Sequence, residues 1–264
     1  MESPISSAMP SERATLEQLT RTPYIQILTY PRISLALAKS RIRQLRALGV
    51  EEFIFEGRAK IGRLGILGLG TVGIVVRART PAEVCALKIR RVDANRPDME
   101  EEARLTTLVN RIGVGVPVYA HTRDFMLMKL LEYQEFHEWL AGLKGDGTRR
   151  TARDVVHTIL NQCRQLDILG VDHGQLSNLR KHVVMAEGRP WIIDFESAGT
   201  SRRPKNVTAA AQYLFIGGRV APLVKRTLGI KDTKPLLRLL SEYKRDSSDY
   251  TYSKILEKLK LASG

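Results

Sequence analysis

Residues 68–75 of the chain read Gly68-Leu69-Gly70-Thr71-Val72-Gly73-Ile74-Val75, which matches the spacing G-x-G-x-x-G-x-V. The glycine spacing alone is a weak signal, because glycines in a loop often form only a turn. In a dinucleotide-binding unit this motif opens a helix, and an acidic residue follows about 20 positions later. Here a β-branched run follows, which favours a strand, and the chain continues to Lys88 instead of an acid. The stretch therefore predicts a glycine-rich hairpin.

Lys88 stands in Ala86-Leu87-Lys88, on the segment that the sequence predicts as the next strand. A glycine-rich hairpin followed by Ala-x-Lys is the arrangement with which protein kinases hold ATP. The glycines let the backbone lie close over the phosphates, and the lysine neutralises the α- and β-phosphate oxygens. The sequence contains no G-x-x-x-x-G-K-[ST] stretch, which excludes the P-loop ATPases. We therefore expect the hairpin and Lys88 to hold ATP.

A lysine in such a site needs a carboxylate to orient it. A helix predicted over residues 97–112 begins with the three glutamates Glu100–Glu102. The periodicity of its apolar stripe slightly favours Glu101, whereas the run Glu-Ala-Arg-Leu favours Glu102, and we select Glu102. The glutamates that do not pair with Lys88 are expected to be solvated in the first turn, where they stabilise the helix dipole.

The run Trp191-Ile192-Ile193-Asp194-Phe195-Glu196 places an aspartate directly after an apolar strand. A carboxylate at a strand end is well placed to hold Mg²⁺ between phosphate groups. We therefore predict that Asp194 is a magnesium ligand. An aspartate that only caps a helix or a turn is the structural alternative.

These motifs resemble those of atypical protein kinases. Ile193-Asp194-Phe195-Glu196 is similar to their DFG segment, and His173-Gly174-Gln175-Leu176-Ser177 is similar to the H-G-D-L-S catalytic loop of the RIO kinases and of the KEOPS-complex kinase. Glu102-Ala103-Arg104-Leu105 and the hinge-like Leu127-Met128-Lys129-Leu130-Leu131-Glu132 fit the same families. Residues 53–215 as a whole resemble the small RIO-like serine/threonine protein kinases of archaea. No A-P-E motif follows Asp194, so a full peptide-docking activation segment is not implied.

The resemblance implies an α+β, two-lobed protein-kinase-like fold, with an antiparallel sheet and one helix in the first lobe and a helical second lobe. We expect a partly helical extension at residues 1–52, the glycine-loop lobe at 53–132, and at 133–264 the helical lobe with the catalytic and metal loops and basic C-terminal helices. The implied activity is ATP- and Mg²⁺-dependent phosphorylation of serine or threonine on proteins, including the chain itself. The residues expected to bind the nucleotide are Gly68, Leu69, Gly70, Thr71, Gly73, Val75, Lys88, Glu102 and Met128.

The catalytic loop departs from the family pattern. Gln175 stands where the family has its catalytic aspartate, and Arg180 stands where the metal-binding asparagine is expected. A glutamine cannot accept a proton at physiological pH, although it can orient a hydroxyl group. Asp172 and Asn178 are the nearby candidates, with a turn-capping aspartate and a loop asparagine as structural alternatives. The predicted catalytic residues are therefore Asp172, Gln175 and Lys88, and the predicted metal ligands are Asp194 and Asn178.

Two rival functions stay open at this point. Gln175 favours a pseudokinase, an ATP-binding switch or scaffold with little transfer activity. A kinase of small molecules, such as an aminoglycoside or choline kinase, usually carries a larger helical insertion that builds the substrate pocket. The stretch between Glu132 and Thr151 is too short for such an insertion, which disfavours this reading.

The formal net charge of +14 is the main departure from an average composition. A basic surface attracts polyanions, so a ribosomal or other RNA-containing partner is one prediction, and a solvated surface without a particular partner is the alternative. The sequence has no RNA-binding signature with interleaved aromatic residues. Arg and Lys interrupt every apolar run, no signal peptide opens the sequence, and Cys85 and Cys163 stand far apart. These features predict a cytoplasmic protein with no membrane partner.

Local patterns predict the remaining elements. Residues 1–13 lack periodicity and are expected to be disordered. A helix with Ser34 as its N-cap precedes the sheet, and another opens with a capping box at Thr151 and ends at Gly170. Residues 234–261 read as one or two basic amphipathic helices.

Overall fold

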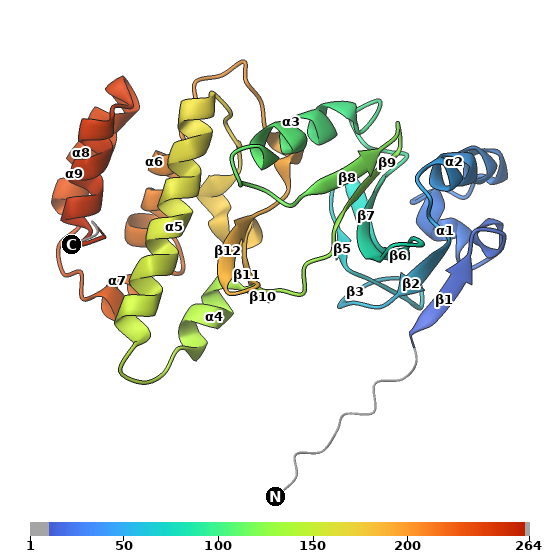
Figure 1. Cartoon of the computed structure of the whole chain (residues 1–264), viewed down its shortest axis with the longest axis horizontal. Helices are drawn as coiled ribbons and strands as arrows, with labels where there is room; N and C mark the ends of the chain where they lie inside the picture. The colour runs from blue at the N-terminus through green and yellow to red at the C-terminus, as the bar shows by residue number, and fades with distance from the viewer. Residues whose placement is uncertain (1–10, 262–264) are drawn as a thin grey trace, which may run out of the picture. The chain divides into compact units, whose positions relative to one another are not determined.

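The computed structural model of the chain describes residues 11–261 and divides into two compact units (Figure 1). The N-terminal unit contains the described residues up to Arg104 together with Pro117–Leu131. The C-terminal unit contains Leu105–Val116 and the described residues from Glu132 onward. The first unit is rich in strands and the second in helices. The predicted α+β class, an antiparallel sheet followed by a helical region, is therefore confirmed at this level.

A seven-stranded antiparallel sheet is the framework of the N-terminal unit. Its strand order is β1-β2-β6-β7-β9-β8, and β5 pairs with β6. The central strands β6 (Gly73–Arg79) and β7 (Val84–Arg90) bury alternate aliphatic side chains in one core, because successive side chains of a strand point to opposite faces. The other strands are β1 (Glu12–Thr15), β2 (Glu52–Phe55), β5 (Gly68–Leu69), β8 (Val118–His121) and β9 (Phe125–Lys129). A separate hairpin pairs β3 (Ala59–Ile61) with β4 (Leu64–Ile66).

The segment before residue 53 shares the core of this sheet. It supplies β1, a 3-10 turn η1 (Gln18–Thr20), helix α1 (Ile25–Leu28) and helix α2 (Leu35–Ala47). Ser34 caps α2 as predicted, since its Oγ accepts a hydrogen bond from the amide nitrogen of Leu37 at 3.3 Å.

The disorder expected for residues 1–13 is wrong for Glu12 and Arg13. These residues pair in antiparallel register with Phe55 and Ile54 of β2. The local composition carries no information on a partner strand that lies far along the chain, so the pairing could not be predicted from it. Residues 1–10 lie outside the described part of the chain.

A buried ion cluster joins α2 to the sheet. Arg41 is fully buried, and its Nη2 lies 2.9 Å from Oδ1 of Asp124. Asp124 also accepts hydrogen bonds from Gln44 at 2.8 Å and from Arg90 at 2.7 Å. Burial by itself raises the pKa of Asp124, but the hydrogen bonds from Arg41 and Gln44 outweigh it and the pKa is lowered. A satisfied buried pair of this kind breaks at high cost when one partner is removed.

Helix α3 (Glu100–Asn110) follows β7, as the sequence predicts. It begins at Glu100 instead of Pro97, because Asp98 stays outside the helix and its Oδ1 accepts a hydrogen bond from the amide nitrogen of Glu100 at 3.1 Å. The side chains of Glu102, Ala103 and Leu105 are buried.

The C-terminal unit combines a small sheet with a long helix. The antiparallel strands β10 (Gln134–Glu135), β11 (Val183–Ala186) and β12 (Arg189–Ile192) form the sheet, and α4 (Phe136–Gly142) follows β10. Helix α5 (Thr148–Leu169) ends at Gly170, which is left-handed with φ 77°, as predicted. The capping box at Thr151 is wrong: α5 already begins at Thr148, and the amide nitrogen of Thr151 donates to the carbonyl of Gly147 at 3.0 Å. That amide therefore needs no side-chain cap.

The remaining chain is helical. The elements are the 3-10 segments η2 (Leu176–Lys181) and η3 (Phe195–Ser197), α6 (Asn206–Gln212), the π-helical turn η4 (Tyr213–Gly217), α7 (Ala221–Leu228), α8 (Lys234–Asp246) and α9 (Asp249–Lys258). The last two confirm the predicted basic helices, and they pack on the same core as α5. Within residues 11–261, no single helix has both the length and the apolar character to cross a membrane. The bent pair of Asn206–Gly217 and Ala221–Leu228 meets that test by length and composition alone.

Candidate functional site

Gly73 and Lys88 are fitted to each other in the N-terminal unit. Val75 pairs with Lys88 across β6 and β7, and Gly73 lies at the start of β6. A Cβ atom on Gly73 would lie 2.9 Å from Cε and 3.1 Å from Cγ of Lys88. A Cβ atom at 2.9 Å would force the lysine stem to shift, so the present path of Lys88 depends on residue 73 having no side chain. The third glycine of the motif thus sets the path of Lys88.

The turn of the hairpin is fixed by backbone bonds. The amide nitrogen of Gly70 donates to the carbonyl of Gly73 at 2.8 Å, and Arg91 donates to the carbonyl of Gly70 at 2.8 Å. Leu69 and Thr71 are exposed in this turn. The hairpin therefore presents backbone and small side chains at its tip, which is the property that close approach to phosphates requires.

Lys88 forms a buried ion pair with Glu102. Its Nζ lies 2.6 Å from Oε1 of Glu102, and the two side chains are 7% and 1% exposed. Glu101 is exposed and pairs with Arg104 at 2.7 Å instead. The run Glu-Ala-Arg-Leu therefore selected the glutamate that meets Lys88, whereas the helical periodicity pointed to its neighbour.

Val75 and Met128 lie in the same sheet as Lys88. Val75 is half-buried and faces the position of Lys88 across the strand pair. Met128 pairs with Ala86 on β7, is half-buried, and packs against the small core of Met99, Ala103 and Met126. The sheet thus brings Val75, Lys88 and Met128 onto neighbouring strands, as their assignment to one binding site requires.

In the C-terminal unit, His173 links the loop after α5 to the loop after β12. The His173 ring packs 4.8 Å from the Phe195 ring and 5.1 Å from the His182 ring. Its Nε2 lies 3.0 Å from the carbonyl oxygen of Ile193, and its backbone nitrogen donates to Asn206 at 2.9 Å. The two stretches that carry the predicted catalytic and metal residues are therefore joined through one buried side chain.

Both histidines of this link are neutral at pH 7. Burial, and secondarily repulsion from His182 when that ring is protonated, lowers the pKa of His173 to about 4. Burial likewise lowers the pKa of His182. Neutral His173 therefore keeps its proton on Nε2, where it donates to the carbonyl of Ile193.

Asp172 is buried and held by the segment that follows Asp194. Arg202 Nε donates to its Oδ2, and the amide nitrogen of Lys205 lies 3.4 Å from its Oδ1. The backbone of Asp172 also exchanges two hydrogen bonds of 2.9 Å with Gly199. Gly174, at φ 84°, has no room for a Cβ because the Arg202 guanidinium and the Ser197 carbonyl lie against it. Both carboxylate oxygens are thus engaged, which is unfavourable for the general-base role that the sequence suggests for Asp172.

Gln175 and Asn178 occupy the irregular segment around η2. Gln175 is partly buried, and its Oε1 is buried without a hydrogen-bond partner among the described residues. Asn178 is exposed, and its φ of −121° and ψ of 61° interrupt the 3-10 turn. An unsatisfied buried acceptor costs about 1–3 kcal/mol, so the amide oxygen of Gln175 has an unused capacity to accept a hydrogen bond.

Asp194 follows β12 in a left-handed conformation, with φ 67° and ψ 75°. Non-glycine residues adopt this region rarely, because it strains the backbone. Strained residues of this kind are held in place by surrounding contacts and cluster at functional sites. Residues 11–261 contain no group of three or more His, Cys, Asp or Glu side chains that could hold a metal ion. Mg²⁺ is commonly held by one or two carboxylates together with substrate phosphates, so Asp194 and the amide oxygen of Asn178 suit it chemically.

The sequence analysis missed two anchors in this region. Arg202 was not singled out, and Asp167, which accepts hydrogen bonds from Asn206 at 2.9 Å and from Tyr243 at 2.9 Å, was not either. Burial raises the pKa of Asp167 in spite of these bonds. The only signal for Arg202 was its place in the basic segment after Asp194, which does not name a partner.

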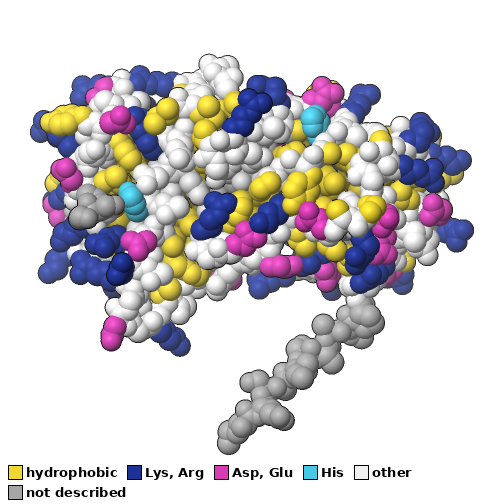
Figure 2. All heavy atoms as spheres, in the orientation of Figure 1, with side chains coloured by type: hydrophobic (Ala, Val, Ile, Leu, Met, Phe, Trp, Pro, Cys, Tyr) yellow, Lys and Arg dark blue, Asp and Glu magenta, His cyan; other side chains and the backbone are white. Residues whose placement is uncertain are grey.

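The basic charge is spread over both units. Figure 2 shows Lys and Arg side chains over α2 in one unit and over α8 and α9 in the other. Several arginines of the N-terminal unit are paired with acids, as Arg77 is with Glu56 at 2.6 Å and Arg79 with Glu52 at 2.9 Å. The sequence has no row of aromatic residues interleaved with these charges, so the positive charge is the only feature of this surface that favours a nucleic-acid partner.

The fold and the site define an α+β protein in which a glycine hairpin adjoins a buried Lys–Glu pair. The uncharacterized protein MJ1211 of Methanocaldococcus jannaschii is 34% identical to this chain over 93 residues, which are 34% of this chain and 79% of that protein. The chain therefore belongs to the same family as MJ1211, whose name states no activity. No family model matches the chain.

Proposed function

We propose that the chain is an ATP- and Mg²⁺-dependent serine/threonine protein kinase of the RIO-like, atypical type, with the two-lobed protein-kinase-like fold. The observation that carries the proposal is the buried pair of Lys88 and Glu102 beside Gly73. A buried pair is costly to desolvate and is weak evidence of a purely stabilising role. In the proposed enzyme, Glu102 orients Lys88 so that its ammonium group meets the α- and β-phosphates.

The loop around Asp194 supports the same activity. Asp194 and Asn178 are the residues that would hold Mg²⁺, which would neutralise the phosphate oxygens. His173 fixes the position of both loops, because it contacts Phe195 and donates to the carbonyl of Ile193. Positioning of this kind supplies much of the rate in phosphoryl transfer, where little covalent chemistry falls to the protein.

In the transfer step, the acceptor hydroxyl oxygen bonds to the γ-phosphorus, and the bond from that phosphorus to the β–γ bridging oxygen breaks. We assign the orientation of the hydroxyl group to Gln175, whose buried Oε1 can accept its hydrogen bond. The proton then passes to a phosphate oxygen or to water, because glutamine cannot take it. Asp172 is a positioning residue in this scheme, since Arg202 and Lys205 hold its carboxylate.

A pseudokinase is the second candidate. It is favoured by the same Gln175, which cannot act as a base, and by the ion pair that engages Asp172. Such a protein would bind ATP and act as a switch or scaffold. An RNA-containing partner and a cytoplasmic location remain predictions under both readings.

Incubation with γ-labelled ATP, Mg²⁺ and a generic acceptor protein tests the proposal. The wild type is expected to label the acceptor or itself, and Asp194→Asn to reduce transfer by more than about 100-fold, the scale on which removal of a charge-stabilising group acts. Asp154→Asn, at an exposed carboxylate of α5 in the same unit, is the control and should transfer at the wild-type rate. ATP binding is measured separately by thermal shift.

Two outcomes discriminate between the candidates. ATP binding without transfer by the wild type would establish the pseudokinase, and in that case Gln175→Asp should introduce transfer if only the base is missing. Equal transfer by wild type and Asp194→Asn would contradict the assignment of Asp194 as a metal ligand.

A further inference from the structure

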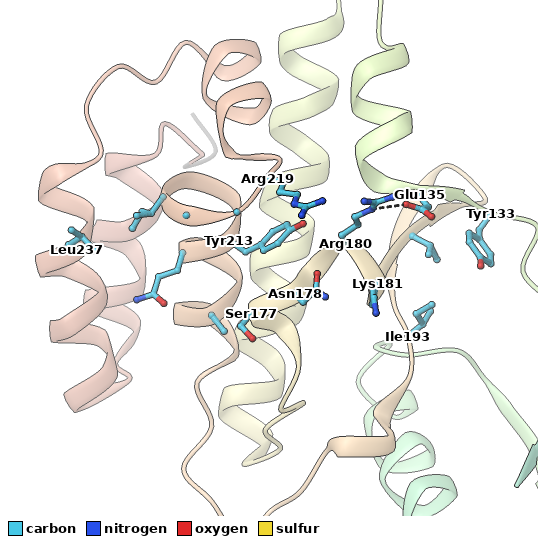
Figure 3. Close-up of a pocket in the computed structure, with 16 residues that line it drawn as sticks. Tyr133, Glu135, Ser177, Asn178, Arg180, Lys181, Ile193, Tyr213, Arg219 and Leu237 are labelled. Carbon is cyan, nitrogen blue, oxygen red and sulfur yellow. Dashed lines mark hydrogen bonds and ion pairs between the residues drawn. The ribbon is translucent and has the colours of Figure 1, made fainter. Parts of the chain in front are cut away.

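Two cavities of the C-terminal unit meet beside the segment around Gln175. The larger, of about 920 Å³, is drawn in Figure 3, and the smaller has a volume of about 350 Å³. They share four lining residues: Ser177, Ala209, Gln212 and Leu237. We call the two together the η2 groove. Its size is that of a binding site for several side chains.

Cations from separate elements line the η2 groove. Lys181 ends η2 and Arg219 precedes α7, both in the larger cavity, while Lys205 precedes α6 and Lys244 lies in α8, both in the smaller. All four side chains are exposed, and none forms an ion pair with a carboxylate in the described part of the chain. Figure 3 shows Lys181 and Arg219 with Asn178 in the same view of the pocket.

The acids of the η2 groove are already neutralised. Glu135 lies 3.2 Å from Arg180 and 3.0 Å from His137. Asp172 is paired with Arg202. The groove therefore has an excess of positive charge and attracts an anionic occupant.

We propose that the η2 groove binds an acidic protein segment, so that the chain selects acceptors with glutamate or aspartate around the target hydroxyl. This rests on the proposed kinase activity for the acceptor role, but the binding itself does not need transfer. Ser177, which follows Gln175 and Leu176 in the chain, lines both cavities, so an occupant of the groove lies beside the proposed catalytic segment.

The smaller cavity favours a peptide over a nucleic acid, whereas the larger cavity carries two aromatic side chains, Tyr133 and Tyr213. Single-stranded nucleic acid is held by a continuous cationic track together with aromatic platforms on which bases stack. The described lining of the smaller cavity contains no aromatic side chain. Besides Lys205 and Lys244, that lining includes the hydroxyl groups of Thr208 and Ser241 and the aliphatic side chain of Leu240. Single cations between hydroxyl and aliphatic groups suit carboxylate side chains on a peptide.

Fluorescence anisotropy without ATP tests the groove. The probes are a labelled peptide with one serine among glutamates, the same peptide with glutamines, and a single-stranded RNA of equal charge. The acidic peptide should bind, and the glutamine peptide should bind at least about tenfold more weakly. Lys205→Ala/Lys244→Ala should weaken the acidic peptide by about tenfold, because each exposed charge contact contributes a factor of about three.

The matched control is Lys231→Ala/Lys234→Ala, which removes the same charge at exposed positions of the same unit outside the groove lining. Equal binding of the acidic peptide by both double variants would overturn the proposal. So would tighter binding of RNA that is lost only in the groove variant, which would assign the groove to nucleic acid. The thermal shift with ATP and the transfer assay are separate measurements, so failure of the kinase activity is distinguishable from failure of the groove.

Discussion

The Lys88–Glu102 pair of the N-terminal unit and the Asp172–Arg202 pair of the C-terminal unit differ in how the chain holds them. Lys88 and Glu102 lie on a long central strand and a helix, and both side chains are nearly fully buried. Asp172 and Arg202 lie in irregular segments, and the arginine side chain is 46% exposed although the aspartate is 2% exposed. The first pair is enclosed by a strand and a helix, and the second joins two irregular segments through a half-exposed arginine.

This difference decides what each pair contributes. In the N-terminal pair, strand register and helix geometry set the positions of both charges before they meet. In the C-terminal pair, the arginine itself orders the loop, because it also donates to the carbonyl of Ser197 and, at 3.1 Å, to that of Asp172. We therefore expect the first pair to be rigid and costly to break, and the second to be cheap to break and able to rearrange.

The largest expected effect is that of Lys88→Ala on stability. The substitution leaves a buried carboxylate, and breaking such a pair costs about 3–5 kcal/mol. Arg96, whose Nη1 lies 4.0 Å from Oε2 of Glu102, compensates in part, so we expect a loss of about 3 kcal/mol in the free energy of unfolding. Chemical denaturation measures it. The same variant should lose most of the thermal shift that ATP produces.

Two further variants separate charge from packing at this pair. Lys88→Met/Glu102→Leu removes both charges and should recover most of the stability, because replacing a buried pair with apolar groups is often neutral. Lys60→Ala, at an exposed position of β3, is the control and should change little. A Lys88→Ala protein as stable as this control would show that the pair is not buried as described.

The same contrast explains how far the sequence could predict this molecule. The hairpin and its strands follow from local patterns, because strand register converts sequence positions into geometry. The partner of Lys88, Glu102, was selected from the run Glu-Ala-Arg-Leu and not from helical spacing. The helical periodicity pointed to Glu101, whereas the neighbouring Glu102 meets Lys88. The apolar stripe of a short helix does not determine which glutamate at its edge faces the lysine. Glu101 is exposed and pairs with Arg104, so it does not turn toward Lys88.

The loop around Asp172 could not be predicted in this way. The position of Asp172 depends on Arg202, on the backbone of Gly199 and on the space left by Gly174, none of which shares a repeating pattern with it. The burial of His173 between Phe195 and His182 likewise joins segments whose distance apart the sequence does not encode. Irregular loops are fixed by such tertiary contacts, and a single sequence gives only their residue types.

The second prediction concerns pH and tests how firmly the C-terminal loops are held. The folded-state pKa of His173, about 4, is below the ordinary value of 6.5, so the unfolded chain binds more protons between these values. Stability is therefore full above about pH 6.5 and falls as the pH drops toward 4. The difference between these two pKa values corresponds to a loss of up to about 3 kcal/mol at pH 4. Asp172 and Asp194 partly oppose the shift, and His182 adds to the loss with the same sign.

Urea denaturation of wild type and His173→Gln at pH 7, 6 and 5 checks this dependence. The variant should be less stable at pH 7 but should show a flatter dependence on pH. His121→Gln, at an exposed histidine, should keep the wild-type slope. A wild-type slope in His173→Gln would mean that another group carries the acid sensitivity.

The smallest expected effect is that of Arg202→Ala, and it tests the comparison most directly. The guanidinium is half-exposed, so solvent screens its pair with Asp172. We expect a loss of about 1 kcal/mol in the free energy of unfolding, well below that of Lys88→Ala. Arg203→Ala, whose side chain donates to the carbonyl of Arg245, is the control for loss of a neighbouring charge. A double-mutant cycle with Asp172→Asn isolates the coupling, which should also be about 1 kcal/mol. A coupling as large as that of Lys88 and Glu102 would show that the two pairs are equally rigid, and that the segment around Asp172 is fixed instead of able to rearrange.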